Sequence, residues 1–386
     1  MIKKKSTQLN YALFYCGFIL LLINKFARII NLFTDTLLAS NYVYLAGIAL
    51  VIFSAMISKF CLIDLLLITY GYFTFILVQD TTLFSFFILL VASKNINIDV
   101  ILRIYVYVQT FILSLSILIY PILLIQGSSY ATVSYVVGRS DIRYNFFFSH
   151  PNNFAIQCVF TVLVYIYLYR NKLSYFKINI IILFTIIFLH IFPKSQTAVI
   201  ALIIYLITLF MIKFAKLIWK PFIKFVFPVV IICISILVYM DYKGMALPFG
   251  NYIYGTFASR FSGAAMSFQI YQVNLFGHNL VNEIGNTIYV NGQWNTFWLD
   301  LAYIRMIIAF GIIGTLAFYY VLIKGLLLHI KSKNYMILSF LVVVIVYAIS
   351  EWTAFSITTV FPLIFCNVAL QSRKPNFLLK KVRIKV

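Results

Sequence analysis

Four arginines and one aspartate are the residues of this chain whose types and positions point most directly to chemistry. The arginines are Arg139, Arg143, Arg260 and Arg305, and the aspartate is Asp300. Charged side chains are costly among long apolar runs unless they have a partner. A guanidinium stays charged and donates two parallel hydrogen bonds, which suits phosphate. Asp300 could accept a proton from an attacking hydroxyl. For each arginine alone, a snorkelling side chain or a structural ion pair is an equally good explanation.

Two further candidates lie in the stretch that begins at Arg143 and includes His150 and Asn152. Pro151 is favoured at the first position of a helix, where its missing N–H would have no helical partner, and a Ser or Asn just before it can cap that helix. The free N–H groups of such a helix start can bind an anion. We therefore predict substrate contacts at His150 and Asn152; the alternative is an ordinary capped span with aromatic residues at the interface.

The other stretch runs from Asp300 through Tyr303 and Arg305. Stabilisation of a helix start by its dipole would also explain Asp300. Tyr303 is a candidate for contact with the substrate or for support of the loop. His278 is the second candidate catalytic residue, although it follows a Phe-Gly pair and could simply complete a turn. Weaker candidates at outer turns are Asp241, Glu283, Glu351, and Ser195 or Thr197 as helix caps.

Motifs for nucleotide and metal chemistry are absent from the sequence. It has no Gly-Lys-Ser/Thr phosphate loop and no His-Glu-x-x-His. The five cysteines lie in apolar runs without paired spacing, so we expect them to be packing residues. ATP hydrolysis and zinc chemistry are therefore disfavoured, and we expect neither a metal nor a cofactor.

The elements that must position these residues are membrane-spanning helices. The chain has 386 residues, of which 63% are hydrophobic and 10% charged, whereas soluble domains carry roughly 25% charged residues. A helix needs ~20 apolar residues to cross the hydrocarbon layer. The sequence predicts an all-α, polytopic integral membrane protein with about 12 spans in a single domain, residues 1–386. The predicted spans are 9–33, 41–58, 60–79, 81–93, 100–125, 152–169, 176–193, 196–213, 219–240, 299–323, 334–350 and 352–372.

Basic residues give the orientation of these spans. With the N-terminus in the cytoplasm, alternation puts 22 of the 30 Lys and Arg residues inside and six outside, while Lys25 and Arg28 fall within the first span. This bias follows the positive-inside rule and places both termini in the cytoplasm. Basic loops that face anionic lipid account for the net charge of +21, so no nucleic-acid partner is needed.

Polar residues collect on the predicted outer face. Seven of the nine acids and three of the four histidines fall there. Two outer segments are long, about 126–151 and about 241–298. A long loop in a compact domain usually has a function or carries short helices of its own. We therefore expect any chemistry to take place on the outer face.

At these stretches the sequence resembles the bacterial polysaccharide repeat-unit polymerases, the Wzy-type proteins of O-antigen, capsule and exopolysaccharide pathways, which are related to the O-antigen ligases. Residues 143–152 resemble the family's segment of arginine, Phe/Gly-rich sequence and His-Pro-Asn before a span. Residues 273–277 resemble its Phe-Gly turn, and residues 259–261 its basic loop segment. Residues 300–311 resemble a stretch with Asp-Asn or His-Asn followed by Gly, although Leu301 replaces the Asn.

The resemblance implies a metal-independent glycosyltransferase of the bacterial plasma membrane. Such proteins join oligosaccharide units carried on undecaprenyl pyrophosphate, and the departing pyrophosphate supplies the energy. In this chain the arginines would neutralise that pyrophosphate, Asp300 or His278 would orient or deprotonate the acceptor hydroxyl, and the apolar spans would hold the polyprenyl tails. A flippase and a chain-length regulator are possible partners.

Three other functions remain open. A lipid-linked oligosaccharide flippase would be expected to have pseudo-symmetric halves and a charged central cavity, whereas no internal repeat is visible. An O-antigen ligase would be expected to have a His at position 300. A membrane O-acyltransferase would be expected to have an early His, and the first His after the N-terminus is His150.

Overall fold

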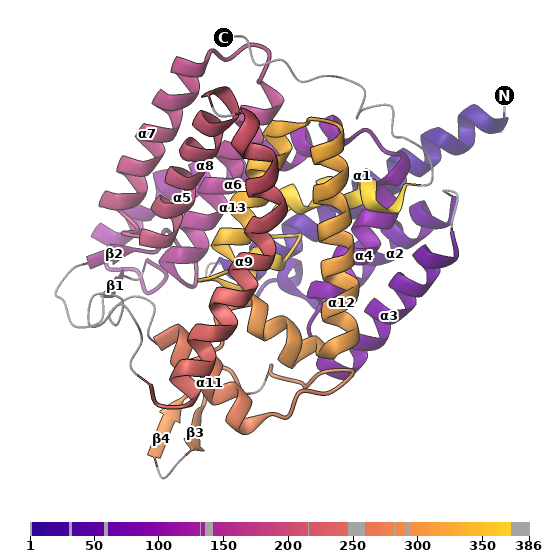
Figure 1. The fold of residues 1–386 in the computed structure, drawn as a ribbon. Coiled ribbons are helices and arrows are strands. Elements are labelled where there is room, and N and C mark those ends of the chain that lie inside the picture. Colours follow the sequence, from indigo (N-terminus) through magenta and orange to yellow (C-terminus); the bar gives the residue numbers. More distant parts are fainter. Residues whose placement is uncertain are drawn as a thin grey trace.

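The computed structural model describes residues 2–30, 33–57, 61–131, 133–135, 142–214, 216–245, 259–281, 283–290 and 293–371. These residues form an assembly of helices with two short hairpins (Figure 1). The α-helices are α1 (Ile2–Ile29), α2 (Asn41–Ile57), α3 (Leu62–Val78), α4 (Thr82–Ala92), α5 (Ile98–Ile125), α6 (Pro151–Leu168), α7 (Tyr175–Ile191), α8 (Gln196–Phe214), α9 (Lys216–Tyr242), α11 (Ser259–Ile270), α12 (Ala302–Lys331) and α13 (Tyr335–Tyr347).

The remaining elements are 3-10 helices and antiparallel strand pairs. The 3-10 helices are η2 (Leu37–Ala39), η3 (Ser93–Asn95), η5 (Trp352–Phe355) and η6 (Phe361–Leu370). Strand β1 (Val133–Tyr135) pairs with β2 (Ile142–Tyr144), with Ser134 opposite Arg143. Strand β3 (Thr287–Val290) pairs with β4 (Gln293–Thr296).

The all-helical fold predicted from the sequence is confirmed, and the lengths and hydropathies of the helices are compatible with a membrane protein. Within the described ranges, five helices are long and apolar enough to cross a membrane: 8–29, 98–125, 151–168, 225–242 and 302–331. Shorter apolar helices occupy the other predicted ranges. Helix α4 lies within the short predicted range 81–93 and has 11 residues, about 16 Å of helix. One range differs from expectation: 352–372 forms two 3-10 segments instead of an α-helix.

Apolar side chains divide between the interior of the bundle and its outer surface. Every residue of α4 is buried, so this short helix lies in the core. Helices α3, α5, α7 and α9 instead expose large apolar side chains, such as Phe73, Phe111, Phe184 and Ile232. Soluble proteins rarely expose apolar patches of this extent. The exposed faces fit contact with lipid hydrocarbon.

Close helix contacts inside the bundle depend on small and polar residues. Gly17 of α1 faces Gly47 of α2 so closely that a Cβ at either glycine would lie 2.8–3.1 Å from the other's carbonyl oxygen. Small residues allow this approach of backbones in membrane helices. Between α5 and α6, the Gln109 amide donates a 2.8 Å hydrogen bond to Gln157. Such a buried polar pair fixes the register of two apolar helices.

The two strand hairpins and helix α11 lie at the same end of the helix bundle (Figure 1). Figure 1 shows both hairpins and α11 at one end, whereas α1 begins at the opposite end. The hairpin β1–β2 belongs to the predicted outer segment 126–151, and α11 with β3–β4 belongs to the predicted segment 241–298. Both long segments therefore have secondary structure of their own, and they lie at the same end.

Helix α12 is broken at Gly311. Its backbone there has φ 69° and ψ −176°, which is not helical. The backbone N–H groups of Ile312 and Ile313 donate to the carbonyls of Asn274 and Leu275 at 3.0 and 3.2 Å, and the His278 N–H donates to Ile308. A loop from segment 241–298 therefore satisfies the groups that the break releases, as membrane depth requires.

Replacing Gly311 with alanine is expected to destabilise the protein by at least about 2–3 kcal/mol, measured by thermal unfolding in detergent. A Cβ at this position would meet the backbone of Gly277 and Leu275 at 2.5 Å, in addition to the strain of positive φ. Gly127 is the matched control, because it has the same φ of 69° but open space around it. The Gly127→Ala variant should lose only about 1 kcal/mol. Equal losses would mean that the loop does not pack against the break.

Candidate functional site

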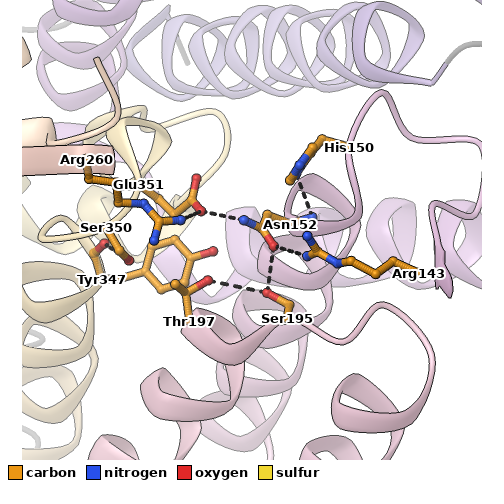
Figure 2. Close-up of polar contacts among 9 residues, drawn as sticks. All are labelled: Arg143, His150, Asn152, Ser195, Thr197, Arg260, Tyr347, Ser350 and Glu351. Atoms are coloured by element: carbon orange, nitrogen blue, oxygen red, sulfur yellow. Dashed lines mark hydrogen bonds and ion pairs between the residues drawn. The ribbon is translucent and has the colours of Figure 1, made fainter. Parts of the chain in front are cut away.

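A buried carboxylate, Glu351, lies at the centre of a polar network at the end of the bundle that carries the hairpins. It follows α13 and is 9% exposed. Its Oε1 accepts a hydrogen bond of 2.7 Å from the Asn152 amide and lies 3.2 Å from the Arg260 guanidinium (Figure 2). Asn152 lies in the first turn of α6 and Arg260 in the first turn of α11. Three segments far apart in the sequence therefore meet at one carboxylate.

Arg143 extends this network from strand β2. Its guanidinium donates to Asn152 Oδ1 at 2.7 Å and to the Pro193 carbonyl at 2.9 Å. Ser195, just before α8, also donates to Asn152 Oδ1 at 3.1 Å (Figure 2). Asn152 thus connects Arg143 to Glu351, because its amide accepts a hydrogen bond from Arg143 and donates one to Glu351. The structure brings Arg143, Arg260 and Asn152 together.

Local sequence explains how the start of α6 is held. Pro151 occupies the first turn, as predicted. The cap is His150 itself, whose Nδ1 accepts a 3.1 Å hydrogen bond from the Asn152 N–H, and not the neighbouring serine. Phe146 and Phe147 adopt positive φ and are buried. Their rings pack against Tyr120, so aromatic contacts hold the strained turn between Arg143 and His150.

Burial and neighbouring charges shift the protonation of this network. Desolvation raises the pKa of Glu351 to about 7, and the charge of Asp300 acts in the same direction, while Arg260, Asn152 and Arg143 oppose the shift. Desolvation together with Arg143 and Arg260 lowers the pKa of His150 to about 4. At neutral pH the histidine is uncharged, and the carboxyl group of Glu351 is divided between its two forms. A group of this kind can accept and return a proton.

Arg305 and Asp300 lie beside this network. Asp300 precedes α12 and interacts electrostatically with both Arg260 and Arg305. Arg305 is 8% exposed, and its guanidinium lies 3.4 Å from Asp80. It also stacks over the Trp352 ring, 3.7 Å from the centroid. The third predicted arginine therefore has its own carboxylate and aromatic partner.

The other predicted site residues are placed elsewhere. His278 lies in the loop at the break in α12, where its Nε2 contacts the Gln272 carbonyl at 2.6 Å and the Asn274 amide at 3.1 Å; these partners are not part of the arginine network. Tyr303 is 4% exposed and donates to the Ile345 carbonyl at 2.6 Å. This placement is that of a packing residue, with its hydroxyl already engaged. Arg139 lies outside the described residues.

Space beside the network is small. A cavity of about 70 Å³ lies between α8 and α13, lined by residues that include Thr197, Tyr347 and Ser350. This volume accommodates a few water molecules but no sugar ring.

Sequence reasoning did not assign the central role to Glu351, nor the supporting role to Ser195. The available signal was an acid at an outer turn next to a tryptophan. That tryptophan is Trp352, which stacks on Arg305. The sequence predicts Ser195 or Thr197 as the cap of α8; the Ser195 carbonyl accepts from the Val199 N–H at 3.1 Å, and its hydroxyl contacts Asn152 and Thr197.

Replacing Arg260 with alanine is expected to destabilise the protein by about 1.4 kcal/mol more at pH 8 than at pH 5.5. At pH 8 the wild-type Glu351, with a pKa of about 7, is mostly ionised beside Arg260, whereas in the variant the buried carboxylate must take up a proton, and each pH unit of this kind is worth about 1.4 kcal/mol. Arg260 lowers the pKa of Glu351, so the pKa of Glu351 is higher in the Arg260→Ala variant than in the wild type. At pH 5.5, which is below both pKa values, the carboxyl group of Glu351 is neutral in both proteins. Thermal unfolding at the two pH values measures this difference.

The matched control for this prediction is the double variant Arg260→Ala/Glu351→Gln. It should recover most of the stability lost at pH 8, because no buried carboxylate is left. Destabilisation that is equal at both pH values and is not recovered in the double variant would show that Arg260 stabilises the protein through packing.

Comparison with known proteins identifies no relative: no family model, no curated protein and no solved structure matches this chain.

Proposed function

We propose that this chain joins oligosaccharide units carried on undecaprenyl pyrophosphate into a surface polysaccharide at the outer face of the bacterial plasma membrane. The observation that carries the proposal is the convergence of Arg143 and Arg260 on the buried Glu351. Guanidinium groups suit a pyrophosphate leaving group, and a carboxyl group with a pKa of about 7 suits proton transfer from a hydroxyl. In this scheme about 12 spans cross the membrane, and both termini lie in the cytoplasm.

In the proposed step, the acceptor hydroxyl oxygen attacks the anomeric carbon of the donor glycan. The bond from that carbon to the pyrophosphate oxygen breaks, and undecaprenyl pyrophosphate leaves with the electron pair. Arg143 and Arg260 stabilise its negative charge, as preorganised cations do at a developing anion. The hydroxyl proton passes to the Glu351 carboxylate. Asp300, a predicted catalytic residue, lies within electrostatic range of Arg260 and Arg305 and would orient them.

Deletion of the gene in its host tests this function. Gel analysis of surface glycans should show loss of the long-chain ladder, while glycan of a single repeat unit persists. A reporter fused within segment 241–298 should read as external. An intact ladder after deletion would contradict the polymerase function, and a cytoplasmic reading of the reporter would contradict the orientation and the site together.

A lipid-linked oligosaccharide transporter is the second candidate. The break of α12 at Gly311 favours it, because discontinuous membrane helices often form substrate sites in transporters. For a transporter, the same deletion would remove the single-unit glycan as well as the ladder. The two proposals therefore predict opposite outcomes for the single-unit band.

A further inference from the structure

A second group of charged residues lies next to the Arg143–Arg260 network and has an ion-pair partner of its own, Asp80. Asp80, between α3 and α4, forms the ion pair with Arg305 and also interacts electrostatically with Lys25 of α1. One carboxylate is thus shared by two cations. Arg28 lies one turn beyond Lys25, and it adds a third cation whose side chain bonds to Ala39 and Asn41. This group carries an excess of positive charge.

Arg305 retains unused capacity to bind an anion. Its Nε is buried and has no hydrogen-bond partner among the described residues. The Arg305–Asp80 contact is a single guanidinium nitrogen at 3.4 Å, which is longer than the 2.7–2.9 Å of a strong charge-assisted hydrogen bond. The Trp352 ring covers one face of the Arg305 guanidinium. This stacking fixes the orientation of the guanidinium plane and leaves its N–H groups free of the ring. A buried donor without an acceptor is costly, and an incoming phosphate oxygen would satisfy it.

We propose that Lys25, Arg305 and Trp352 form a second pyrophosphate subsite, separate from the one at Arg143 and Arg260. This inference rests on the proposed function, because each new linkage requires two lipid-linked molecules at once. The donor loses its pyrophosphate, whereas the acceptor keeps it. Asp300 interacts electrostatically with both Arg260 and Arg305, so its negative charge acts on both cationic groups.

The two subsites differ in a way that matches the two roles. Arg143 and Arg260 are linked through Asn152 to Glu351, the proposed proton acceptor. The Lys25–Arg305 group is paired with Asp80, whose other oxygen accepts from the Thr82 N–H at 2.9 Å. We assign the leaving pyrophosphate to the first group and the acceptor lipid, whose pyrophosphate bond stays intact, to the second.

Native mass spectrometry of the full-length protein in detergent, titrated with undecaprenyl pyrophosphate, tests this assignment. The wild-type protein should bind two molecules. The Lys25→Met and Arg143→Ala variants should each bind one at the same concentration, with the lost site weakened at least about tenfold, which is the loss expected for one charge-assisted hydrogen bond. Lys25→Arg, which keeps the charge, should still bind two. Uncharged undecaprenol and inorganic pyrophosphate, added separately, distinguish binding of the lipid tail from binding of the phosphates.

Lys243→Met is the matched control, because Lys243 follows α9 at the same end of the bundle and its ammonium group lies over the rings of Tyr239 and Tyr242. It should bind two molecules. Wild-type binding of one molecule, or of two in the Lys25→Met variant, would refute the second subsite and leave the proposed function intact. Absence of any binding by the wild type would instead overturn the proposed function. Monodisperse elution of each variant confirms that it is folded.

Discussion

Replacing Glu351 with glutamine is expected to lower the rate of polymerisation by roughly 10²–10⁴-fold, the range for loss of a general base. The glutamine side chain keeps an oxygen that can accept hydrogen bonds from Asn152 and Arg260. Its amide group cannot take the proton of the acceptor hydroxyl. The wild-type rate should rise with pH through about 7, where the buried Glu351 ionises. The residual rate of the variant should lack this dependence. Chain growth on lipid-linked units in membranes measures both effects.

Glu283→Gln is the control for this prediction. Glu283 is an acid of segment 241–298 and an alternative base on sequence grounds, and its described hydrogen bonds use its backbone. Its substitution should leave the rate and the pH profile unchanged. A Glu351→Gln variant with the wild-type pH profile would remove Glu351 from the proton transfer and return Asp300 to that role.

Replacing Arg143 with alanine is expected to reduce polymer synthesis by roughly 10²–10³-fold, as for loss of one preorganised charge stabiliser. The protein should remain folded, because the partners of Arg143 among the described residues, Asn152 and the Pro193 carbonyl, are neutral. Removal of Arg143 therefore leaves no buried charge without a counter-charge. Arg143→Lys should retain part of the activity, since lysine keeps the charge but lacks the planar fork.

The matched control for Arg143 is Arg170→Ala. Arg170 likewise donates to a backbone carbonyl, that of Tyr167, and lies on the predicted inner face near Asp99. Its removal should leave the chain-length distribution unchanged. Equal losses in the two variants would indicate that a general loss of arginine contacts, and not pyrophosphate binding, reduces the activity.

Helix positions were the part of the fold that sequence could predict. The predicted span 41–58 corresponds to α2 (Asn41–Ile57), because an apolar run of this length has few alternatives in a membrane. The range 352–372 was predicted as a span like the others, yet it forms η5 and η6. Hydropathy reports that residues avoid water and does not report which hydrogen-bond pattern they adopt.

The break in α12 could not be read from its own sequence. A single glycine at position 311 is compatible with a continuous membrane helix. The break exists because a loop from segment 241–298 supplies the carbonyls of Asn274 and Leu275 to the released N–H groups. Such an arrangement depends on a contact between segments that sequence periodicity does not report.

In the candidate site, contacts between residues close in the sequence could be predicted, whereas contacts between residues far apart in the sequence could not. Arg143 and Asn152 are nine residues apart, and the helix start between them was recognised from Pro151. Arg260 and Glu351 are separated by 91 residues, and no local pattern connects them. The burial that raises the pKa of Glu351 is also a property of the folded chain. The sequence therefore indicated the two arginines, Arg143 and Arg260, but gave no reason to rank Glu351 above the other outer acids.

Reconstitution of the purified protein in liposomes with undecaprenyl-pyrophosphate-linked repeat units, without ATP and with EDTA, tests the central claim most directly. The proposal predicts that glycan chains lengthen and that one undecaprenyl pyrophosphate is released for each new linkage. Units that cross the bilayer without growing in length, or that remain unchanged, would contradict it.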